Sequence, residues 1–144
     1  MEKIEVKKKY PDTIIVKIFE TKPVAIIFKD KKKYLLDSLS NLIFFEEYEN
    51  FGKLPNVYGK EADKNFLIFF DSLKKNNFPN KEIKNFYYFK IGRWDIQLKN
   101  NRTVKFPENI TDELIEKSIN LISRKDFEEY NIIDLRVAGK IIVD

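Results

Sequence analysis

Cysteine and histidine are both absent from the 144-residue chain. Their absence excludes a thiolate nucleophile, a zinc site made of cysteine and histidine ligands, a serine–histidine–aspartate triad and an imidazole proton switch. A chain without cysteine is equally compatible with reducing and oxidising compartments, so the compartment has to be inferred from other features. The sequence also has no glycine-rich phosphate loop and no internal repeat.

Long apolar runs are absent too. No run approaches the ~18 to 20 residues of a membrane-spanning helix, and the N-terminus lacks the continuous apolar segment of a signal peptide. Hydrophobic residues nevertheless make up 43% of the chain and charged residues 35%. This balance supports one hydrophobic core, excludes global disorder and predicts that the chain alone is soluble.

Positive charge is concentrated near the N-terminus. Residues 1–33 hold ten lysines against five acidic residues, a net charge of +5, whereas the whole chain carries +4. Such lysines could bind anionic lipid or nucleic acid, or they could form a solvated face. Arginine, the preferred residue for bidentate phosphate contacts, occurs only four times. The solvated face is therefore the main interpretation, and a small basic nucleic-acid-binding domain is the alternative.

Two segments have the apolar spacing of amphipathic helices. In residues 60–75, apolar side chains recur every three or four positions, with acidic residues near the start and lysines at the end. A second helix is expected to begin after Thr111, a suitable N-cap, and to end near Arg124.

Most of the remaining chain has the alternation and turn residues of β-strands. We expect strands at residues 4–9, 13–20, 24–28, 34–36, 42–45, 83–90, 94–98, 103–106, 132–137 and 140–143. Residues 52–59 are expected to form a loop, because Pro55 and two glycines interrupt them. Trp94 and Ile96 should face the core while Asp95 faces solvent. The predicted fold class is α+β, with a mixed or antiparallel sheet and two amphipathic helices.

The segment at residues 13–20 is apolar on both faces, so a strand there needs cover on both sides. Too few residues precede it to supply that cover. Either the start of the chain is truncated, or the cover comes from another chain.

Five segments, read in order, resemble motifs of the bacterial cell-division family FtsQ, also called DivIB. Residues 9–25 resemble its aromatic-Pro-x-x-Leu strand and its Glu-x-x-Pro-x-Ala stretch, and residues 36–43 its Asp-x-x-Gly turn, with Ser40 in place of the usual glycine. Residues 54–59 (LPNVYG), 93–100 (RWDIQLKN) and 133–136 (IDLR) resemble three further motifs. Each motif alone is weak, whereas five in the right order are moderately specific.

The resemblance implies a domain organisation. Residues 1–26 resemble the last two strands of a POTRA domain, and residues 27–144 resemble the family's β domain. A cytoplasmic tail, one transmembrane helix and the first part of the POTRA domain would then precede Met1. The domain would lie on the periplasmic side of the inner membrane.

The resemblance also implies a non-enzymatic scaffold that binds the division proteins FtsB and FtsL, with no cofactor, no metal and no nucleic acid. Family members bind partners at the last strand, where an extended segment adds to the sheet edge. The matching positions here are Arg136, Val137, Gly139, Lys140, Ile141 and Ile142. Val137 stands where the family commonly has an aromatic residue. Alternatively, Ile141 and Val143 are simply core residues of a closing strand.

Other candidate sites have more ordinary interpretations. Trp94 with Arg93 could form a binding hot spot, although a core tryptophan is expected on an alternating strand. Asp134 and Arg136 could read a partner's charge or form an incidental pair. Asp37, Asp95 and Asp134 could serve as acid and base only if the fold brought them together, and no motif supports such catalysis.

Overall fold

A computed structural model describes residues 22–44 and 54–144. The strands expected at residues 4–9 and 13–20 lie outside the described residues. The predicted domain boundary at residue 26 falls inside a strand, β2 (Pro23–Lys29), and stays a prediction.

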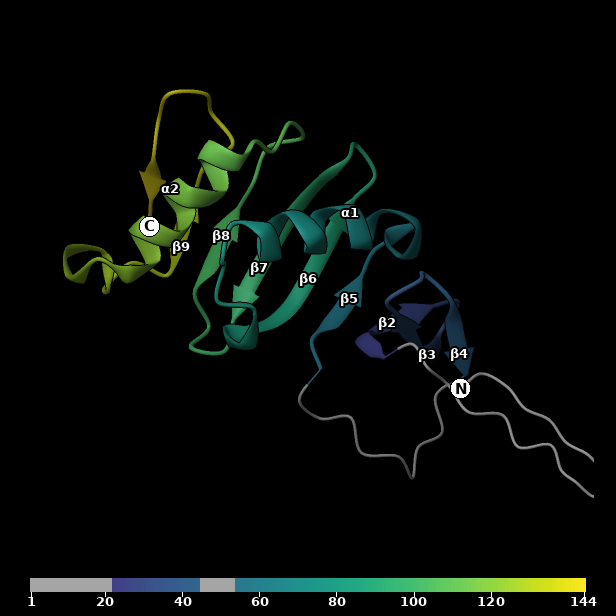
Figure 1. Cartoon of the computed structure of the whole chain (residues 1–144). Coiled ribbons are helices and arrows are strands. Elements are labelled where there is room, and N and C mark those ends of the chain that lie inside the picture. The colour runs from purple at the N-terminus through teal and green to yellow at the C-terminus, as the bar shows by residue number, and fades with distance from the viewer. Residues whose placement is uncertain (1–21, 45–53) are drawn as a thin grey trace, which may run out of the picture.

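The described strands form one nine-stranded sheet in the order β10-β9-β8-β7-β6-β5-β2-β3-β4 (Figure 1). The strands are β2, β3 (Lys32–Asp37), β4 (Leu42–Phe44), β5 (Asn56–Tyr58), β6 (Ile83–Phe89), β7 (Arg93–Leu98), β8 (Thr103–Lys105), β9 (Ile132–Asp134) and β10 (Ile142–Val143). Three pairs are parallel, β2 with β5, β5 with β6 and β8 with β9, and the others are antiparallel. With two α-helices added, this mixed sheet confirms the α+β prediction.

Both helices form where the apolar spacing predicted them. α1 (Ala62–Lys75) buries Phe66, Phe69 and Leu73. α2 (Asp112–Ser123) begins after Thr111, whose side-chain oxygen accepts a hydrogen bond from the Leu114 N–H at 3.1 Å. This contact satisfies one of the N–H groups that the first turn of a helix leaves unpaired. Two short 3-10 helices, Asn80–Glu82 and Lys125–Phe127, are the remaining elements of the described residues.

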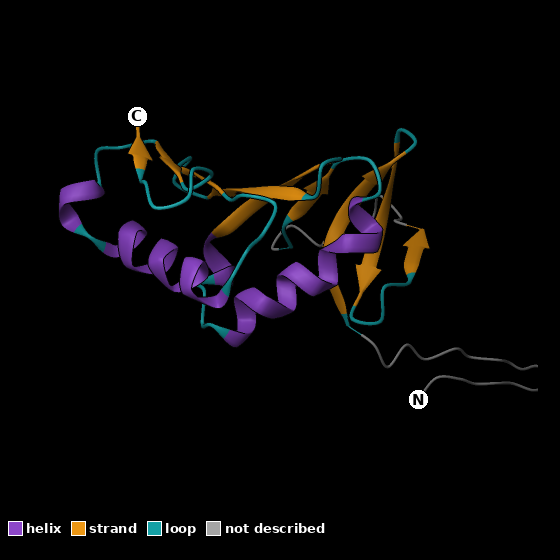
Figure 2. Ribbon diagram, turned by 90° about the horizontal axis from the view of Figure 1, so that it is seen from above, coloured by secondary structure: helices purple, strands orange, loops and turns teal. Residues whose placement is uncertain are grey.

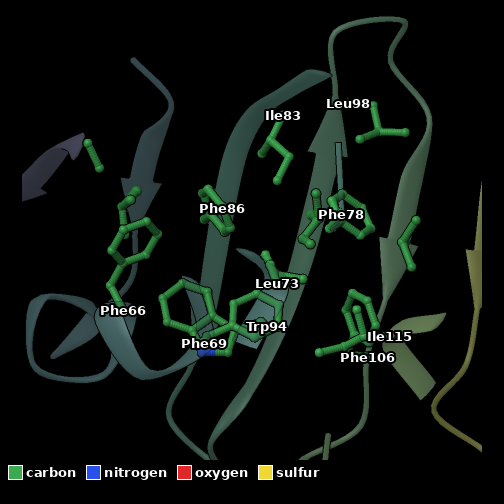
Figure 3. Packing of buried hydrophobic residues seen from close by; sticks show 14 of the residues in the cluster. Phe66, Phe69, Leu73, Phe78, Ile83, Phe86, Trp94, Leu98, Phe106 and Ile115 are labelled. Atoms are coloured by element: carbon green, nitrogen blue, oxygen red, sulfur yellow. The ribbon is translucent and has the colours of Figure 1, made fainter. Parts of the chain in front are cut away.

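The helices cover one face of the sheet, and the core lies between the two layers (Figure 2). Phe66 and Phe69 of α1 pack against Phe86 of β6 and Trp94 of β7 (Figure 3). The rings of Phe69 and Trp94 are stacked with centroids 5.3 Å apart. Trp94 is 3% exposed, so it is a core residue and its interpretation as an exposed binding residue is wrong.

Three sequence predictions about the strands were wrong. The expected loop at residues 52–59 contains β5, which lies in the middle of the sheet between β2 and β6. β9 ends at Asp134 and not at residue 137, as predicted. β10 begins at Ile142 and not at residue 140. After Asp134 the chain turns: its carboxylate accepts the Arg136 N–H at 3.0 Å, in place of a ladder bond.

The β2–β3 hairpin turns tightly at Asp30 and Lys31, whose φ angles of 52° and 66° are both positive. Positive φ at both central residues is the geometry of a type I′ turn, which matches the twist of the flanking strands. The lysines at this tip, Lys31 to Lys33, are exposed to solvent.

Candidate functional site

The C-terminal strand β10 lies at one edge of the sheet. It pairs antiparallel with β9, with Ile142 opposite Asp134 and Val143 opposite Ile133. Within the described residues, β9 is its only neighbouring strand. An edge strand exposes unpaired backbone groups on its outer side.

The hydrogen bonds between β9 and β10 show which backbone groups point outward. Asp144 and Ile132 exchange both N–H···O bonds at 3.1 Å, so they form a hydrogen-bonded pair. Such pairs alternate along an antiparallel ladder, which makes Ile142–Asp134 the next bonded pair. The N–H and C=O groups of Ile141 and Val143 therefore point away from β9, toward the outer side of the edge.

The six predicted site residues lie along the segment that joins β9 to β10. Ile142 is the only one inside a strand, and Arg136, Val137, Gly139, Lys140 and Ile141 form the connection before it. All six are exposed, including the apolar side chains of Val137 and Ile142, each 46% exposed, and Ile141, which is 37% exposed. Val143 is half-buried against the core, so the core interpretation holds for Val143 and not for Ile141.

A groove of about 280 Å³ lies beside this segment. Leu114 and Leu135 contribute apolar side chains to it, and Lys117, Arg136 and Lys140 contribute positive charge. The groove therefore extends the exposed edge toward the start of α2, with a cationic rim.

Arg136 is held in place by Asp134. Its Nε and Nη2 atoms donate hydrogen bonds to the two carboxylate oxygens, at 2.9 and 2.7 Å. The side-chain hydrogen bond from Arg136 lowers the pKa of Asp134, and the same contact raises the pKa of Arg136. The arginine side chain remains 43% exposed, so the pair presents a fixed positive group next to the edge strand.

Asp95 was expected to face solvent, and that expectation is wrong, because the residue is 7% exposed. It lies on the sheet face opposite the helices, where it forms an ion pair with Arg93. Burial raises the pKa of Asp95, and the hydrogen bond from Arg93 opposes that rise. Arg93 also covers the ring of Phe89, with its guanidinium carbon 4.1 Å from the ring centroid.

The register places Asp95, Lys105 and Asp134 side by side on β7, β8 and β9. The third candidate carboxylate, Asp37, lies apart at the end of β3, where it accepts backbone hydrogen bonds from Leu39 and Asn41. Lys105 separates the two carboxylates that share a face, so the arrangement is a charged row and not an acid–base pair. Among the described residues, no group of three or more acidic side chains is placed to hold a metal ion.

Asp95 and Asp134 should contribute to the pH dependence of folding stability with opposite signs. Asp134 has a lowered pKa, so its contribution to stability is present above the ordinary value of about 3.9 and is lost as the pH falls. Asp95 has a raised pKa, so ionisation costs stability, and that cost is relieved as the pH falls through the raised value. Unfolding by urea from about pH 7 to about pH 3 measures both.

In that titration the stability advantage of wild type over Asp134→Asn, at most about 1 kcal/mol because solvent screens Arg136, should shrink with acidification. The free energy of unfolding of wild type, relative to that of Asp95→Asn, should instead increase with acidification. Parallel curves for the two variants would show that the two carboxylates do not have opposite pKa shifts.

The site residues that the sequence prediction missed are Val143 and Asp144. Val143 directs its backbone groups outward, and Asp144 fixes the strand to β9. Their signal is the alternation of the edge strand, in which residues 141 and 143 share one backbone direction and residues 142 and 144 the other.

The described molecule is thus a two-layer α+β domain whose last strand lies at a sheet edge. Comparison with curated proteins finds similarity over almost the whole chain. The cell division protein FtsQ of Rickettsia typhi is 26% identical over 147 residues, which cover 99% of this chain and 54% of that protein. FtsQ of Rhizobium radiobacter is 25% identical over 151 residues, covering 99% of this chain and 69% of that protein.

These relatives support the FtsQ/DivIB family for this chain, as the five sequence motifs predicted. No family model matches the chain. The chain spans about half the length of the Rickettsia relatives.

Among solved structures, the major extracytoplasmic domain of the cell division protein DivIB from Geobacillus stearothermophilus aligns with 71% of this chain and 87% of that chain. The TM-score is 0.44 and the sequence identity is 9%. In the part of the chain that the structure describes, no helix is long and apolar enough to span a bilayer.

Proposed function

We propose that this chain is the extracytoplasmic part of a non-enzymatic cell-division scaffold, which binds FtsB- and FtsL-type partners by strand addition to β10. The observation that carries the proposal is the position of β10 at the sheet edge, with the backbone groups of Ile141 and Val143 directed outward. The similarity to FtsQ proteins supports the cell-division role.

The surroundings of β10 favour an extended partner. An added strand gains main-chain hydrogen bonds from the outward groups, and its alternate side chains find different environments on the two faces. Ile142 lies on the same face as Asp134 and its partner Arg136, whereas Val143 lies on the face of Ile133 and the core. A partner strand that places polar side chains on the first face and apolar side chains on the second fits this edge.

The proposal includes the domain organisation and location inferred from the resemblance. Residues 1–26 would complete a POTRA domain, and residues 27–144 would form the β domain. The chain would work on the periplasmic side of the inner membrane. Sequencing the DNA upstream of Met1 tests this part, because an in-frame apolar stretch of ~20 residues is required.

A backbone substitution tests the docking edge. Val143→Pro removes one outward N–H and leaves the bonds from β10 to β9 in place, because proline is tolerated on the outer side of an edge strand. We expect the affinity for a fluorescent FtsB-type periplasmic peptide to fall about fivefold, which corresponds to about 1 kcal/mol for one lost hydrogen bond.

Val143→Ala is the matched control, since it shortens the same side chain and keeps the N–H group. It should bind the peptide more tightly than the proline variant. Equal affinity of the two variants would show that the Val143 N–H takes no part in docking.

A further inference from the structure

The edge strand has a self-complementary sequence. Its five residues, Lys140 to Asp144 (KIIVD), carry opposite charges at the two ends and apolar side chains between them. Lys140 and Asp144 each lie two residues from Ile142 in the sequence, and both are exposed. If two copies pair antiparallel about Ile142, Lys140 of each copy lies opposite Asp144 of the other, and every apolar residue lies opposite an apolar residue.

The direction of the backbone groups is compatible with the same register and excludes a shift by one residue. In a pairing centred on Ile142, Ile141 of one copy lies opposite Val143 of the other, and both direct their N–H and C=O groups outward. They can therefore exchange both hydrogen bonds of an antiparallel pair. A shift by one residue would place Ile141 opposite Asp144, whose backbone groups are bonded to Ile132 on the inner side.

We propose that β10 pairs with β10 of a second copy of this chain, which gives a two-fold dimer with one continuous sheet. The outward backbone groups exclude a shift by one residue, and the charge pattern selects this register among those that remain. Isologous pairing of this kind is the commonest geometry of homodimers. It also covers an edge whose exposed isoleucines would otherwise promote unspecific strand pairing.

The dimer itself does not depend on the function proposed above; only the following prediction of competition rests on that function. The dimer and the partner strand would use the same backbone groups of Ile141 and Val143, so they would exclude each other. Partner binding should then weaken as the chain concentration rises, and an excess of partner peptide should dissociate the dimer.

Two charge variants test the register. Lys140→Asp and Asp144→Lys each place like charges opposite one another in the dimer, so each variant alone should dimerise about tenfold more weakly than wild type. An equimolar mixture restores opposite charges at both positions, and the two different chains should pair as tightly as wild type. Analytical ultracentrifugation with one variant labelled measures all three cases.

A cysteine substitution tests the centre of the pairing, because the chain has no cysteine of its own. In the proposed dimer the two Ile142 residues lie opposite each other as a non-hydrogen-bonded pair of the antiparallel ladder. Their Cα atoms would be about 4.5 Å apart, which is within the range of a disulfide. Ile142→Cys should therefore form disulfide-linked dimers under mild oxidation. Val137→Cys has the same exposure in the native chain, 46%, and is the matched control that should cross-link slowly.

A wild-type chain that remains monomeric at its solubility limit would overturn the dimer. So would a mixture of the charge variants that associates no better than either variant alone, or equal cross-linking of the two cysteine variants. None of these results affects strand addition by a partner, which Val143→Pro tests separately at low chain concentration.

Discussion

Replacing Arg102 by alanine is expected to destabilise the fold by about 3 kcal/mol, because three partly buried carbonyl groups lose their hydrogen-bond donor. The guanidinium donates from Nε to the Tyr130 oxygen at 3.1 Å, from Nη1 to the Ile122 oxygen at 3.1 Å and from Nη2 to the Phe127 oxygen at 2.8 Å. The residue is 7% exposed. Urea unfolding monitored by Trp94 fluorescence measures the loss.

Arg124→Ala is the control for this experiment. Arg124 follows α2 directly, and its side-chain hydrogen bonds go to the exposed carboxylate of Asp126. Its removal should change the free energy of unfolding little, since exposed ion pairs contribute little. If the two variants unfold at the same urea concentration, the carbonyl contacts of Arg102 do not stabilise the fold.

Arg102 also matters for the candidate site. It ties the β7–β8 turn to the end of α2 and to the segment that leads into β9. Because β9 positions β10, Arg102→Lys should loosen the docking edge while keeping the charge: one amine cannot reach three separate carbonyls in the way that a planar guanidinium does.

Replacing Gly59 by alanine is expected to cost about 3 kcal/mol. Gly59 follows β5 with φ 125°, where a side chain is strained, and an added Cβ would lie 2.3 Å from the Tyr88 carbonyl oxygen. The backbone of β6 would have to move to relieve that contact, and such overpacking typically costs 1–3 kcal/mol in addition to the conformational strain.

Gly92→Ala separates the cost of backbone strain from the cost of the close contact with Tyr88. Gly92 has a similar φ of 102°, but an added Cβ would meet no atom within 4 Å. Its expected cost is about 1 kcal/mol from backbone strain alone. Thermal unfolding of both variants measures the difference, and equal costs would mean that close packing of Gly59 against Tyr88 is unimportant.

The helices and the long antiparallel strands could be predicted from the sequence because their signals are local. The apolar spacing of residues 60–75 depends only on helix geometry, and Thr111 caps α2 through a contact three residues away. The turn after Asp37, which the resemblance predicted, also rests on local contacts, because the Asp37 carboxylate accepts the Leu39 and Asn41 N–H groups. There Ser40 adopts a φ of 67°, a conformation that glycine accepts more readily.

β5 could not be predicted in this way, because its pairing is entirely non-local. It has three residues, and Pro55 and Gly59 flank it with typical turn chemistry. Only its parallel neighbours β2 and β6, distant in sequence, make it a strand. The same holds for Arg102: in sequence it belongs to a polar turn, and only the fold brings its three carbonyl partners to it.

The candidate site was predicted in part. The resemblance near the C-terminus led to six residues, and the structure places five of them in the exposed connection from β9 to β10 and one, Ile142, in β10 itself. The direction of the backbone groups could not be read from the sequence, because it depends on the register of β9 and β10. That register is what brings Val143 into the candidate site.

Hydrogen exchange at the Val143 amide is the most direct test of the docking edge. At chain concentrations too low for self-pairing, this N–H should exchange quickly in the free chain and slowly once an FtsB-type peptide is bound. The Asp144 amide, already bonded to the Ile132 oxygen, should change much less. A peptide that binds and slows exchange elsewhere, while the Val143 amide keeps its free rate, would contradict strand addition at β10.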